Sequence, residues 1–466
     1  MKPLLEKRPL RSYITLVVLA LLAFACGYAI EWDLSALASA ESREQSWQRL
    51  TSLLSAFGTP DLSSEYLKQV FGWSLDTLAV AVLGVAIAAV LGFVLALGAS
   101  QRVMVGNRGP IAWLQRSFVE VIRVLLDVLR GVPDFVWAVM LVAIFGFGPI
   151  AGLCAIVLNV SGSLGKMYSE LWDNVRPNRY EALKVTGVGR AKLLLYGIQP
   201  LTGRGMISFT LMRTECAVRN ASVIGIVGGG GLGSEIQEEL GYGNWGKVAT
   251  LILATIVVTA FADVVSTFLR YQLRNDPNQS RKRFATPRGQ ILRTYLGVLA
   301  LAAIVVGCIV DLWEPLRDKS KDLFDLKQWE ILGKLYGDLL TPSFKSNVLE
   351  TALTSSIVPI AMAVFGTGLG VLGAMLLAFP ASRSMNASSQ NFTGEQVPWW
   401  RDLIRRLRTL SAKSLALIAR AIPEVTWVMI LLAIFRVSMV PAIFAIGIHS
   451  AGVLSRVFTE SIDDQP

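Results

Sequence analysis

Long apolar segments recur along the chain and constrain its fold more than any other feature. A helix needs about 20 apolar residues to cross the hydrocarbon core of a membrane. Candidate spans lie at residues 13–30, 75–97, 132–147, 150–164, 207–226, 248–269, 295–312, 356–379, 426–437 and 440–457. Charged residues make up only 17% of the chain, against about 25% in a typical soluble protein. We therefore predict an all-α polytopic membrane protein with about 10 spans.

Basic residues set the predicted orientation. They gather in the N-terminal tail and in residues 102–130, 166–204, 270–293 and 383–420. The positive-inside rule places these segments, and the N-terminus, in the cytoplasm of an inner or plasma membrane. The run 13–30 is longer than a typical signal-peptide core, so we interpret it as a retained span. Topology accounts for the net charge of +10, and a nucleic-acid partner is not predicted.

The two halves of the chain share residues at constant spacing. At an offset of 282 residues, Tyr13, Cys26, Ala99 and Ser100 match Tyr295, Cys308, Ala381 and Ser382. At an offset of 290 residues, Arg130, Pro133, Trp137 and Glu170 match Arg420, Pro423, Trp427 and Glu460. An insertion near residues 386–400 accounts for the change of offset. We predict a tandem parallel repeat: residues 1–275, a basic cytoplasmic linker 276–292, and a second repeat 293–466.

The second predicted repeat is shorter than the first. Its last residue corresponds to Arg176 of the first repeat. The residues that follow Arg176 in the first repeat therefore have no counterpart in the second. A frameshift, a split gene or a separate permease chain could each account for this difference, and the sequence does not choose among them.

Residues 176–200 read RPNRYEALKVTGVGRAKLLLYGIQP and lie on the predicted cytoplasmic side. Asn178 is predicted to cap a helix whose third residue is Glu181. Gly187 and Gly189 are expected to break that helix, and a second short helix is expected to end at Pro200. Such a basic helix–turn–helix is suited to docking in a cleft of a soluble partner, although it could also be an ordinary solvated loop.

This segment resembles the EAA motif of binding-protein-dependent ABC importer permeases. The matching residues are Glu181, Ala182, Leu183, Gly187, Ile198 and Pro200, with Leu183 in place of alanine and Gln199 in place of leucine. In that family the loop, here 178–200, is the coupling helix that sits in a groove of the ATPase subunit. The resemblance implies type I importer transmembrane domains, two ATPase subunits and a periplasmic or surface substrate-binding protein.

Further segments are similar to the phosphonate-type permeases of that family. They are residues 130–149, 161–170 and 219–233 in the first repeat and 420–435 and 449–463 in the second. The resemblance implies a phosphonate or a related phosphorus oxyanion as substrate. Methionine and osmoprotectant permeases share parts of these patterns and remain alternatives. A secondary transporter could also use repeats, and transport without any ATPase would distinguish it.

Ionisable and glycine residues near predicted span 207–226 are the candidates for a substrate path. They are Arg213, Glu215, Arg219, Gly228, Gly229 and Gly230. Ionisable groups inside a membrane are costly, and arginine suits an oxyanion. Equally, Glu215 could pair with an arginine in a purely structural role. The glycine run at 228–231 favours close packing or a re-entrant turn.

Catalytic chemistry is not predicted. The chain has no G-x4-G-K-[ST] motif, so ATP hydrolysis is assigned to a partner subunit. Its four cysteines lack metal-binding spacing, and the single histidine, His449, is expected to pack or to hydrogen-bond. We therefore predict no metal site and no cofactor. Asp134 and Glu424 are each expected to cap a helix that begins at the preceding proline.

Overall fold

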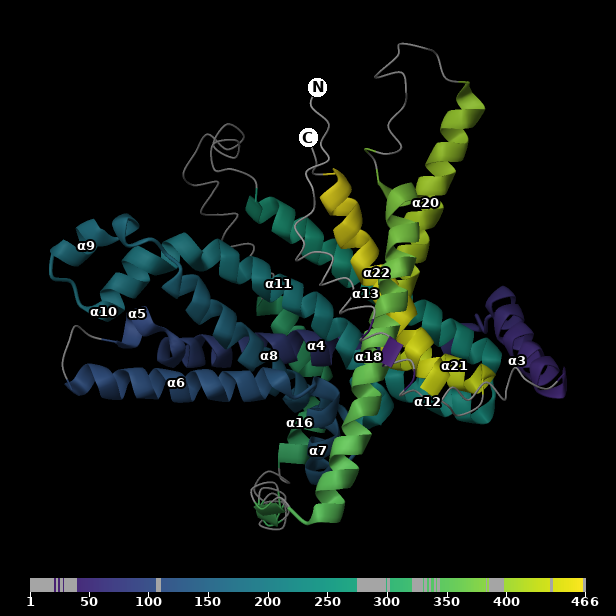
Figure 1. Ribbon diagram of the computed structural model, residues 1–466, viewed down its shortest axis with the longest axis horizontal. Helices are drawn as coiled ribbons and strands as arrows, with labels where there is room; N and C mark the ends of the chain where they lie inside the picture. Colours follow the sequence, from purple (N-terminus) through teal and green to yellow (C-terminus); the bar gives the residue numbers. More distant parts are fainter. Residues whose placement is uncertain are drawn as a thin grey trace. The chain divides into compact units, whose positions relative to one another are not determined.

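A computed structural model describes residues 40–105, 110–274, 302–320, 344–382, 398–435 and 439–463, with isolated positions between these ranges (Figure 1). The described residues form helices joined by short connections. The chain divides into two compact units, Met1–Pro60 with Gly337–Pro466, and Asp61–Tyr336. Most of predicted span 13–30, the predicted linker and most of the predicted insertion lie outside the described residues.

The unit Asp61–Tyr336 is built around two long helices that pack closely, α4 (Ser64–Ala99) and α8 (Pro149–Asp173). A Cβ atom on Gly84 would lie 2.9 Å from Ile156, and one on Gly92 would lie 3.1 Å from the Ser161 carbonyl. Small residues therefore permit the close crossing. The other helices of this unit are α5 (Gln101–Met104), α6 (Pro110–Gly131), α7 (Asp134–Phe145), α9 (Glu181–Val185), α10 (Arg190–Leu193), α11 (Gln199–Ile224), α12 (Leu232–Tyr242), α13 (Trp245–Arg274) and α16 (Trp313–Ser320), with the short turns η1 (Pro177–Arg179), η2 (Leu194–Ile198) and η3 (Gly225–Gly229).

The unit containing the C-terminal residues has α3, followed by four helices in the same order as α4, α6, α7 and α8 of the other unit. The helices of this unit are α3 (Ala40–Gly58), α18 (Ser346–Ala381), α20 (Trp399–Ala421), α21 (Glu424–Ile434) and α22 (Met439–Asp463). Helices α18 and α22 pack together as α4 and α8 do. A Cβ atom on Gly366 would lie 2.8 Å from Ile446, and these two residues are the counterparts of Gly84 and Ile156 at the offsets of the predicted repeat.

Side-chain contacts also recur at these offsets. The indole of Trp137 donates to the Leu129 carbonyl, and that of Trp427 donates to the Ala419 carbonyl, both at 3.2 Å. Asn159 donates to the Val132 carbonyl at 2.9 Å, and a ring nitrogen of His449 lies 3.2 Å from the Ile422 carbonyl. His449 thus makes the hydrogen-bonding contact expected of it.

Two sharp bends change the predicted spans. Helices α6 and α7 meet at 87°, and the described parts of α20 and α21 meet at 89°. Proline lacks an N–H group and cannot continue a helix, so Pro133 and Pro423 separate the two limbs. Helix α7 has 12 residues and rises only about 18 Å, which is too short for a hydrocarbon core of about 30 Å. The prediction that 132–147 spans the membrane by itself is therefore wrong.

Five helices among the described residues are long and apolar enough to cross a membrane, or seven if each bent pair counts as one span. The five are α4, α8, α13, α18 and α22. Predicted span 207–226 lies mostly in α11, whose apolar character is interrupted by charged residues such as Arg213 and Glu215. The prolines occupy the N-cap positions of α7 and α21, and neither helix has a side-chain cap hydrogen bond. Asp134 and Glu424 are thus the first residues of these helices and not their N-caps, although the Asp134 carboxylate accepts a hydrogen bond from the Phe135 N–H group at 3.1 Å.

Candidate functional site

The segment 176–200 folds as two short helices joined by a glycine turn, close to the prediction. Its first helix, α9, begins at Glu181, but its N-cap is Tyr180 and no side chain caps it. Asn178 instead lies in the preceding 3-10 turn, η1. The predicted Asn178 cap is therefore wrong, because the turn that starts at Pro177 carries the chain into the helix.

Gly187 makes the turn between α9 and α10 with φ of +75°, a left-handed conformation that favours glycine. Gly189 has φ of −62°, which any residue adopts readily. Only the first of these two glycines is therefore required by the backbone.

Replacing Gly187 with alanine is expected to destabilise the turn by about 1–2 kcal/mol, since the left-handed conformation disfavours a Cβ atom. Hydrogen exchange of α9 and α10 should then accelerate by about 5- to 30-fold. Gly189→Ala is the matched control, because neither glycine has a neighbour within 4 Å of its Cβ position. Equal exchange rates in the two variants would contradict a role for the left-handed turn.

The second short helix does not end at Pro200, as predicted, but continues into α11. Residues 190–224 are helical throughout, with a π-helical turn, η2, between α10 and α11. Pro200 lies in the first turn of α11, where a missing N–H group is tolerated. The extra residue of the π-helical turn keeps the helix continuous past the proline. Any force on α10 would therefore act directly on α11.

The matched motif residues divide into exposed and buried ones. Glu181 and Ala182 are exposed, and Val185 between the motif positions is 81% exposed. Ile198 is only 2% exposed and belongs to the core of the unit. It therefore packs the segment against the core and cannot contact a docked partner. Leu183 is half-buried, and its side chain lies 3.3 Å from the Cβ position of Gly197.

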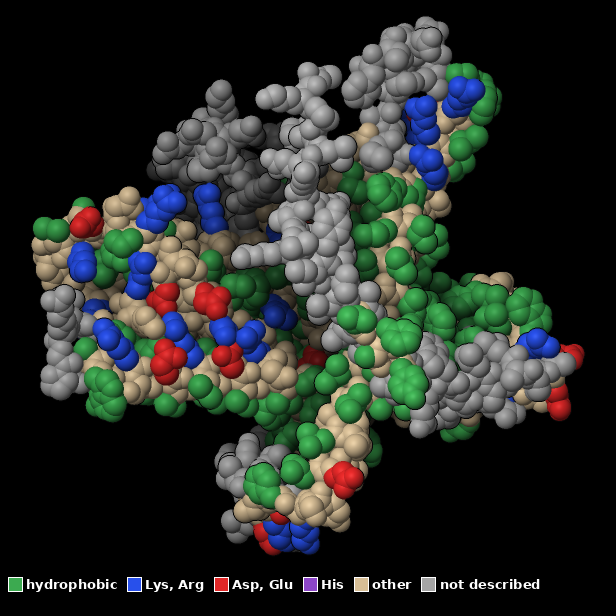
Figure 2. Space-filling view, in the orientation of Figure 1, with side chains coloured by type: hydrophobic (Ala, Val, Ile, Leu, Met, Phe, Trp, Pro, Cys, Tyr) green, Lys and Arg blue, Asp and Glu red, His purple; other side chains and the backbone are tan. Residues whose placement is uncertain are grey.

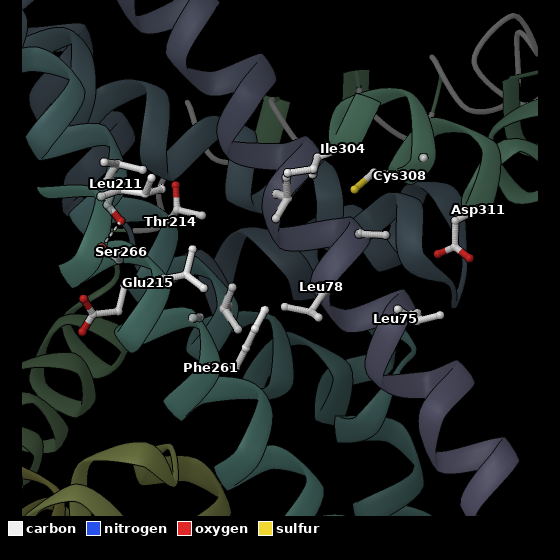
Figure 3. A pocket seen from close by; sticks show the side chains of 17 residues that line it. Leu75, Leu78, Leu211, Thr214, Glu215, Phe261, Ser266, Ile304, Cys308 and Asp311 are labelled. Carbon is white, nitrogen blue, oxygen red and sulfur yellow. Dashed lines mark hydrogen bonds between the residues drawn. The ribbon is translucent and has the colours of Figure 1, made fainter. Parts of the chain in front are cut away.

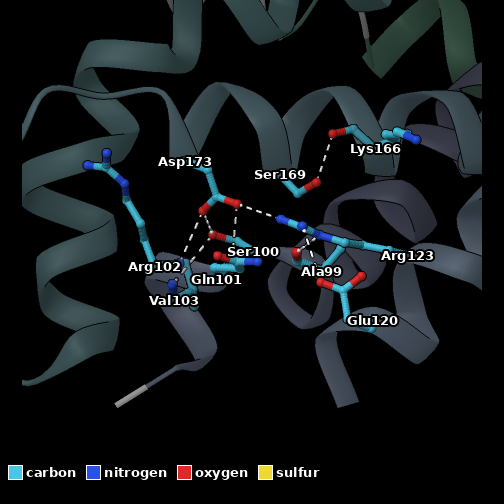
Figure 4. A network of polar contacts seen from close by, with 10 residues as sticks. All are labelled: Ala99, Ser100, Gln101, Arg102, Val103, Glu120, Arg123, Lys166, Ser169 and Asp173. Carbon is cyan, nitrogen blue, oxygen red and sulfur yellow. Dashed lines mark hydrogen bonds and ion pairs between the residues drawn. The ribbon is translucent and has the colours of Figure 1, made fainter. Parts of the chain in front are cut away.

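A carboxylate at the end of α8 joins this helix to three others beside this segment (Figure 4). Asp173 accepts hydrogen bonds from the Ser100 hydroxyl at 2.7 Å and from the backbone N–H groups of Gln101 and Arg102 at 3.2 and 3.1 Å. The guanidinium of Arg123 in α6 lies 2.9 Å from the same carboxylate. The group therefore fixes the ends of α4 and α8, the start of α5 and the middle of α6 relative to one another.

Two arginines connect this network to the segment. Arg102 donates to the Val175 carbonyl and, at 2.6 Å, to the Tyr180 hydroxyl. Arg190 at the start of α10 donates to the Met104 carbonyl at 2.6 Å. The residues before α9 and the first residue of α10 are thus tied to α5, which follows α4 directly.

The sequence analysis did not identify these positioning residues. One signal was available, since Ser100 and Ser382 match at the repeat offset. In the other unit, Ser382 donates to Asp463 at 2.6 Å, and Asp463 is the counterpart of Asp173. A second missed contact is the Trp172 indole, which donates to the Gln199 side chain at 3.0 Å. Gln199 thus has a structural partner at the position where leucine is usual in the motif.

The ionisable candidates on α11 are not arranged as one cluster. Glu215 is buried and lies 3.3 Å from Arg270 of α13, a partner that was not among the candidates. Arg213 lies over the Phe209 ring, 5.6 Å from its centroid. The Nε atoms of Arg213 and Arg219 are buried and have no hydrogen-bond partner among the described residues.

Glu215 borders a cavity of about 530 Å³ between α4, α11, α13 and residues 302–311 (Figure 3). Leu78, Leu211, Phe261 and similar apolar side chains form most of its wall, while Glu215 and Asp311 contribute carboxylates. Arg213 and Arg219 do not line it. Its apolar and acidic lining does not suit an anion.

The glycine run reverses the chain between α11 and α12, which confirms the predicted close packing. A Cβ atom on Gly225 would lie 2.5 Å from the Gly230 carbonyl oxygen. Gly228 and Gly230 have φ of +104° and +77° and border a second cavity, of about 960 Å³. Ser234, Gln237, Glu238 and Tyr242 of α12 line it as well. Gly229 is instead buried against Ile224. The six candidate path residues therefore occupy separate places.

Comparison with known proteins identifies the family. Residues 103–275 match the family described as the inner membrane component of binding-protein-dependent transport systems. HtxC of Stutzerimonas stutzeri, a permease protein assigned provisionally to phosphite transport, is 34% identical over 223 residues, which cover 48% of this chain and 75% of HtxC. PtxC of the same species, a phosphite transport system permease protein, is 31% identical over 196 residues, covering 42% of this chain and 68% of PtxC.

A longer match extends over both units. PhnE of Mycolicibacterium smegmatis, a phosphate-import permease protein, is 24% identical over 392 residues, which cover 84% of this chain and 66% of PhnE. The family match includes α6 to α13 and the whole of segment 176–200. The chain therefore belongs to the family of inner membrane components of binding-protein-dependent transport systems.

Proposed function

We propose that this chain is the permease subunit of an ATP-driven ABC importer for phosphite, phosphate, phosphonate or a related phosphorus oxyanion. The observation that carries the proposal is the structure of segment 176–200. It exposes Glu181, Ala182 and Val185 while Arg102 and Arg190 fix it to the helical core. The names of HtxC, PtxC and PhnE support the substrate class.

The arrangement suggests how closure of an ATPase dimer would reach the membrane helices. An ATPase groove that moves α9 and α10 would move α11 through its continuous helix, and α4, α6 and α8 through Asp173. Binding of ATP can shift the permease only by favouring one of its states over the other. A substrate-binding protein would deliver the oxyanion at the opposite face, and two ATPase subunits would hydrolyse the ATP.

The two matching sets of helices, which lie within residues 64–173 and 346–463, support the proposed tandem repeat. Helices α4 and α18 each have 36 residues, and α8 and α22 each have 25. Each set includes a bend of nearly a right angle at a proline and a serine–aspartate contact at its end. In the first set, Arg213 and Arg219 would supply positive charge to the substrate path.

Val185→Asp is expected to prevent co-purification of the cognate ATPase subunits. The new carboxylate would lie on the exposed docking surface, where desolvation of an unpaired charge opposes binding. The thermal stability of the permease should change little, because the side chain contacts solvent. Leu54→Asp on α3 is the matched control, since Leu54 is also a large exposed apolar residue. Retention of the ATPase by Val185→Asp would count against docking at this loop.

The substrate class is tested separately in proteoliposomes that contain the permease, the ATPase and the binding protein. Uptake of phosphite, phosphate or methylphosphonate that depends on ATP supports the proposal. Uptake of methionine or glycine betaine alone would overturn the substrate assignment and leave the importer assignment intact. Uptake without the ATPase would indicate a secondary transporter.

A further inference from the structure

The N-terminal half of α20, residues 399–410, has one apolar and one basic face. With 3.6 residues per turn, large apolar side chains fall on a single side of the helix. They are Trp399, Trp400, Leu403, Ile404, Leu407 and Leu410. Trp399 is 78% and Leu410 is 61% exposed. The buried residues of α20 are Ala412 and Ala421, so among the described residues its N-terminal half contributes no buried side chain.

Part of this apolar stripe, and its continuation at Leu415 and Ile418, recurs on α6, the counterpart of α20. Positions related by the repeat offset of 290 carry exposed apolar residues in both helices. The pairs are Trp113 and Leu403, Leu114 and Ile404, Leu125 and Leu415, and Val128 and Ile418. On α6 these positions stay exposed although α9, α10 and α11 are present. The stripe therefore faces the surroundings of the protein, and for a membrane protein these surroundings are lipid.

The basic residues distinguish α20 from α6. Helix α20 carries six basic residues and one acidic residue, whereas α6 carries three basic and two acidic residues. Two of the three arginines on α6 pair with carboxylates, Arg123 with Asp173 and Arg130 with Asp127. On α20 the single acidic residue, Asp402, pairs with Arg406 at 2.8 Å. Figure 2 shows Lys and Arg side chains gathered at the N-terminal end of α20, next to hydrophobic ones.

We infer that residues 399–410 bind anionic lipid headgroups at the membrane surface. Tryptophan side chains favour the membrane–water interface, and the apolar stripe would insert among the acyl chains. Arginine side chains on the opposite edge reach back to the headgroups, whose phosphates accept paired hydrogen bonds from a guanidinium. The inference needs only a membrane around the chain, so it stands or falls independently of the transported substrate.

The test compares hydrogen exchange of the full-length chain in nanodiscs of phosphatidylcholine with and without phosphatidylglycerol. Exchange of residues 399–410 is expected to slow severalfold when phosphatidylglycerol is present, while residues 110–121 of α6 should not change. The slowing should disappear in the variant Arg401→Gln/Arg405→Gln. It should persist in Arg43→Gln/Arg49→Gln, which removes two exposed arginines from α3 of the same unit.

Equal exchange in the two lipids would overturn the inference. So would slowing that requires the ATPase subunits instead of phosphatidylglycerol, since the surface would then bind protein. If the variant does not fold, the unmodified chain provides the test. High salt should reduce the effect of phosphatidylglycerol, because screening weakens charge attraction at an exposed surface. An effect that persists at high salt would also overturn the inference.

Discussion

Asp173→Ala is expected to lower the free energy of unfolding by about 2–4 kcal/mol and to release segment 176–200, the proposed ATPase-docking segment, from the helical core. The carboxylate accepts hydrogen bonds from two backbone N–H groups and a serine hydroxyl, and it pairs with Arg123. Its side chain is 20% exposed, so solvent would only partly compensate for these lost interactions. Thermal unfolding in detergent and co-purification of the ATPase subunits measure the two effects.

Asp127→Ala is the matched control for Asp173→Ala. Asp127 pairs with Arg130 at 2.8 Å and with Lys166 at 2.5 Å on the same two helices, α6 and α8, but its side chain is 46% exposed. Exposed pairs contribute about 1 kcal/mol or less, so this variant should retain its ATPase subunits. Equal losses in both variants would show that the network around Asp173 has no particular role in holding the segment.

Asp463→Ala tests the corresponding position in the other unit. Asp463 accepts from the hydroxyl of Ser382 and from the backbone N–H of Ser384 at 3.0 Å. Ser384 stands at the repeat position of Arg102, so this unit has no arginine there to reach a following segment. Asp463→Ala should therefore reduce stability without the additional loss of ATPase binding expected for Asp173→Ala.

The sequence predicted those features that depend on local periodicity. The cores of α4, α8, α13, α18 and α22 fall within predicted spans, because a long apolar run and a spanning helix have nearly the same limits. The turn at Gly187 was also predictable, since glycine between two helical patterns favours a left-handed residue. These features needed no knowledge of distant parts of the chain.

Features that depend on long-range contacts were not predictable in the same way. Asp173 lies more than 70 residues from Ser100, and nothing in the local sequence of either residue indicates the other. The partner of Glu215 was missed for the same reason, because Arg270 lies on another helix. The π-helical turn before Pro200 was missed because the motif alone suggests that the proline ends a helix. Comparing the two repeats is the one sequence method that would have indicated the serine–aspartate contact.

Gly233→Ala is expected to destabilise the crossing of α11 and α12 by about 3 kcal/mol. A Cβ atom there would lie 2.0 Å from the Ser222 carbonyl oxygen, 2.8 Å from the Ile226 nitrogen and 2.9 Å from the Gly225 Cα atom. All three neighbours are backbone atoms, so no side chain can rotate to make room. Thermal unfolding in detergent and the yield of membrane-inserted protein should both fall.

Gly241→Ala in the same helix is the matched control for this prediction. No atom lies within 4 Å of the Cβ position of Gly241, and alanine forms helices more readily than glycine by about 1 kcal/mol. The control should therefore be as stable as the unmodified chain or more stable. The difference in stability between the two variants tests the role of Gly233, because only at Gly233 does the missing side chain let two backbone segments approach each other. If Gly233→Ala unfolds at the same temperature as Gly241→Ala, α11 and α12 do not cross as closely as the structure shows, and the glycine run would not fix the cavity beside Gly228.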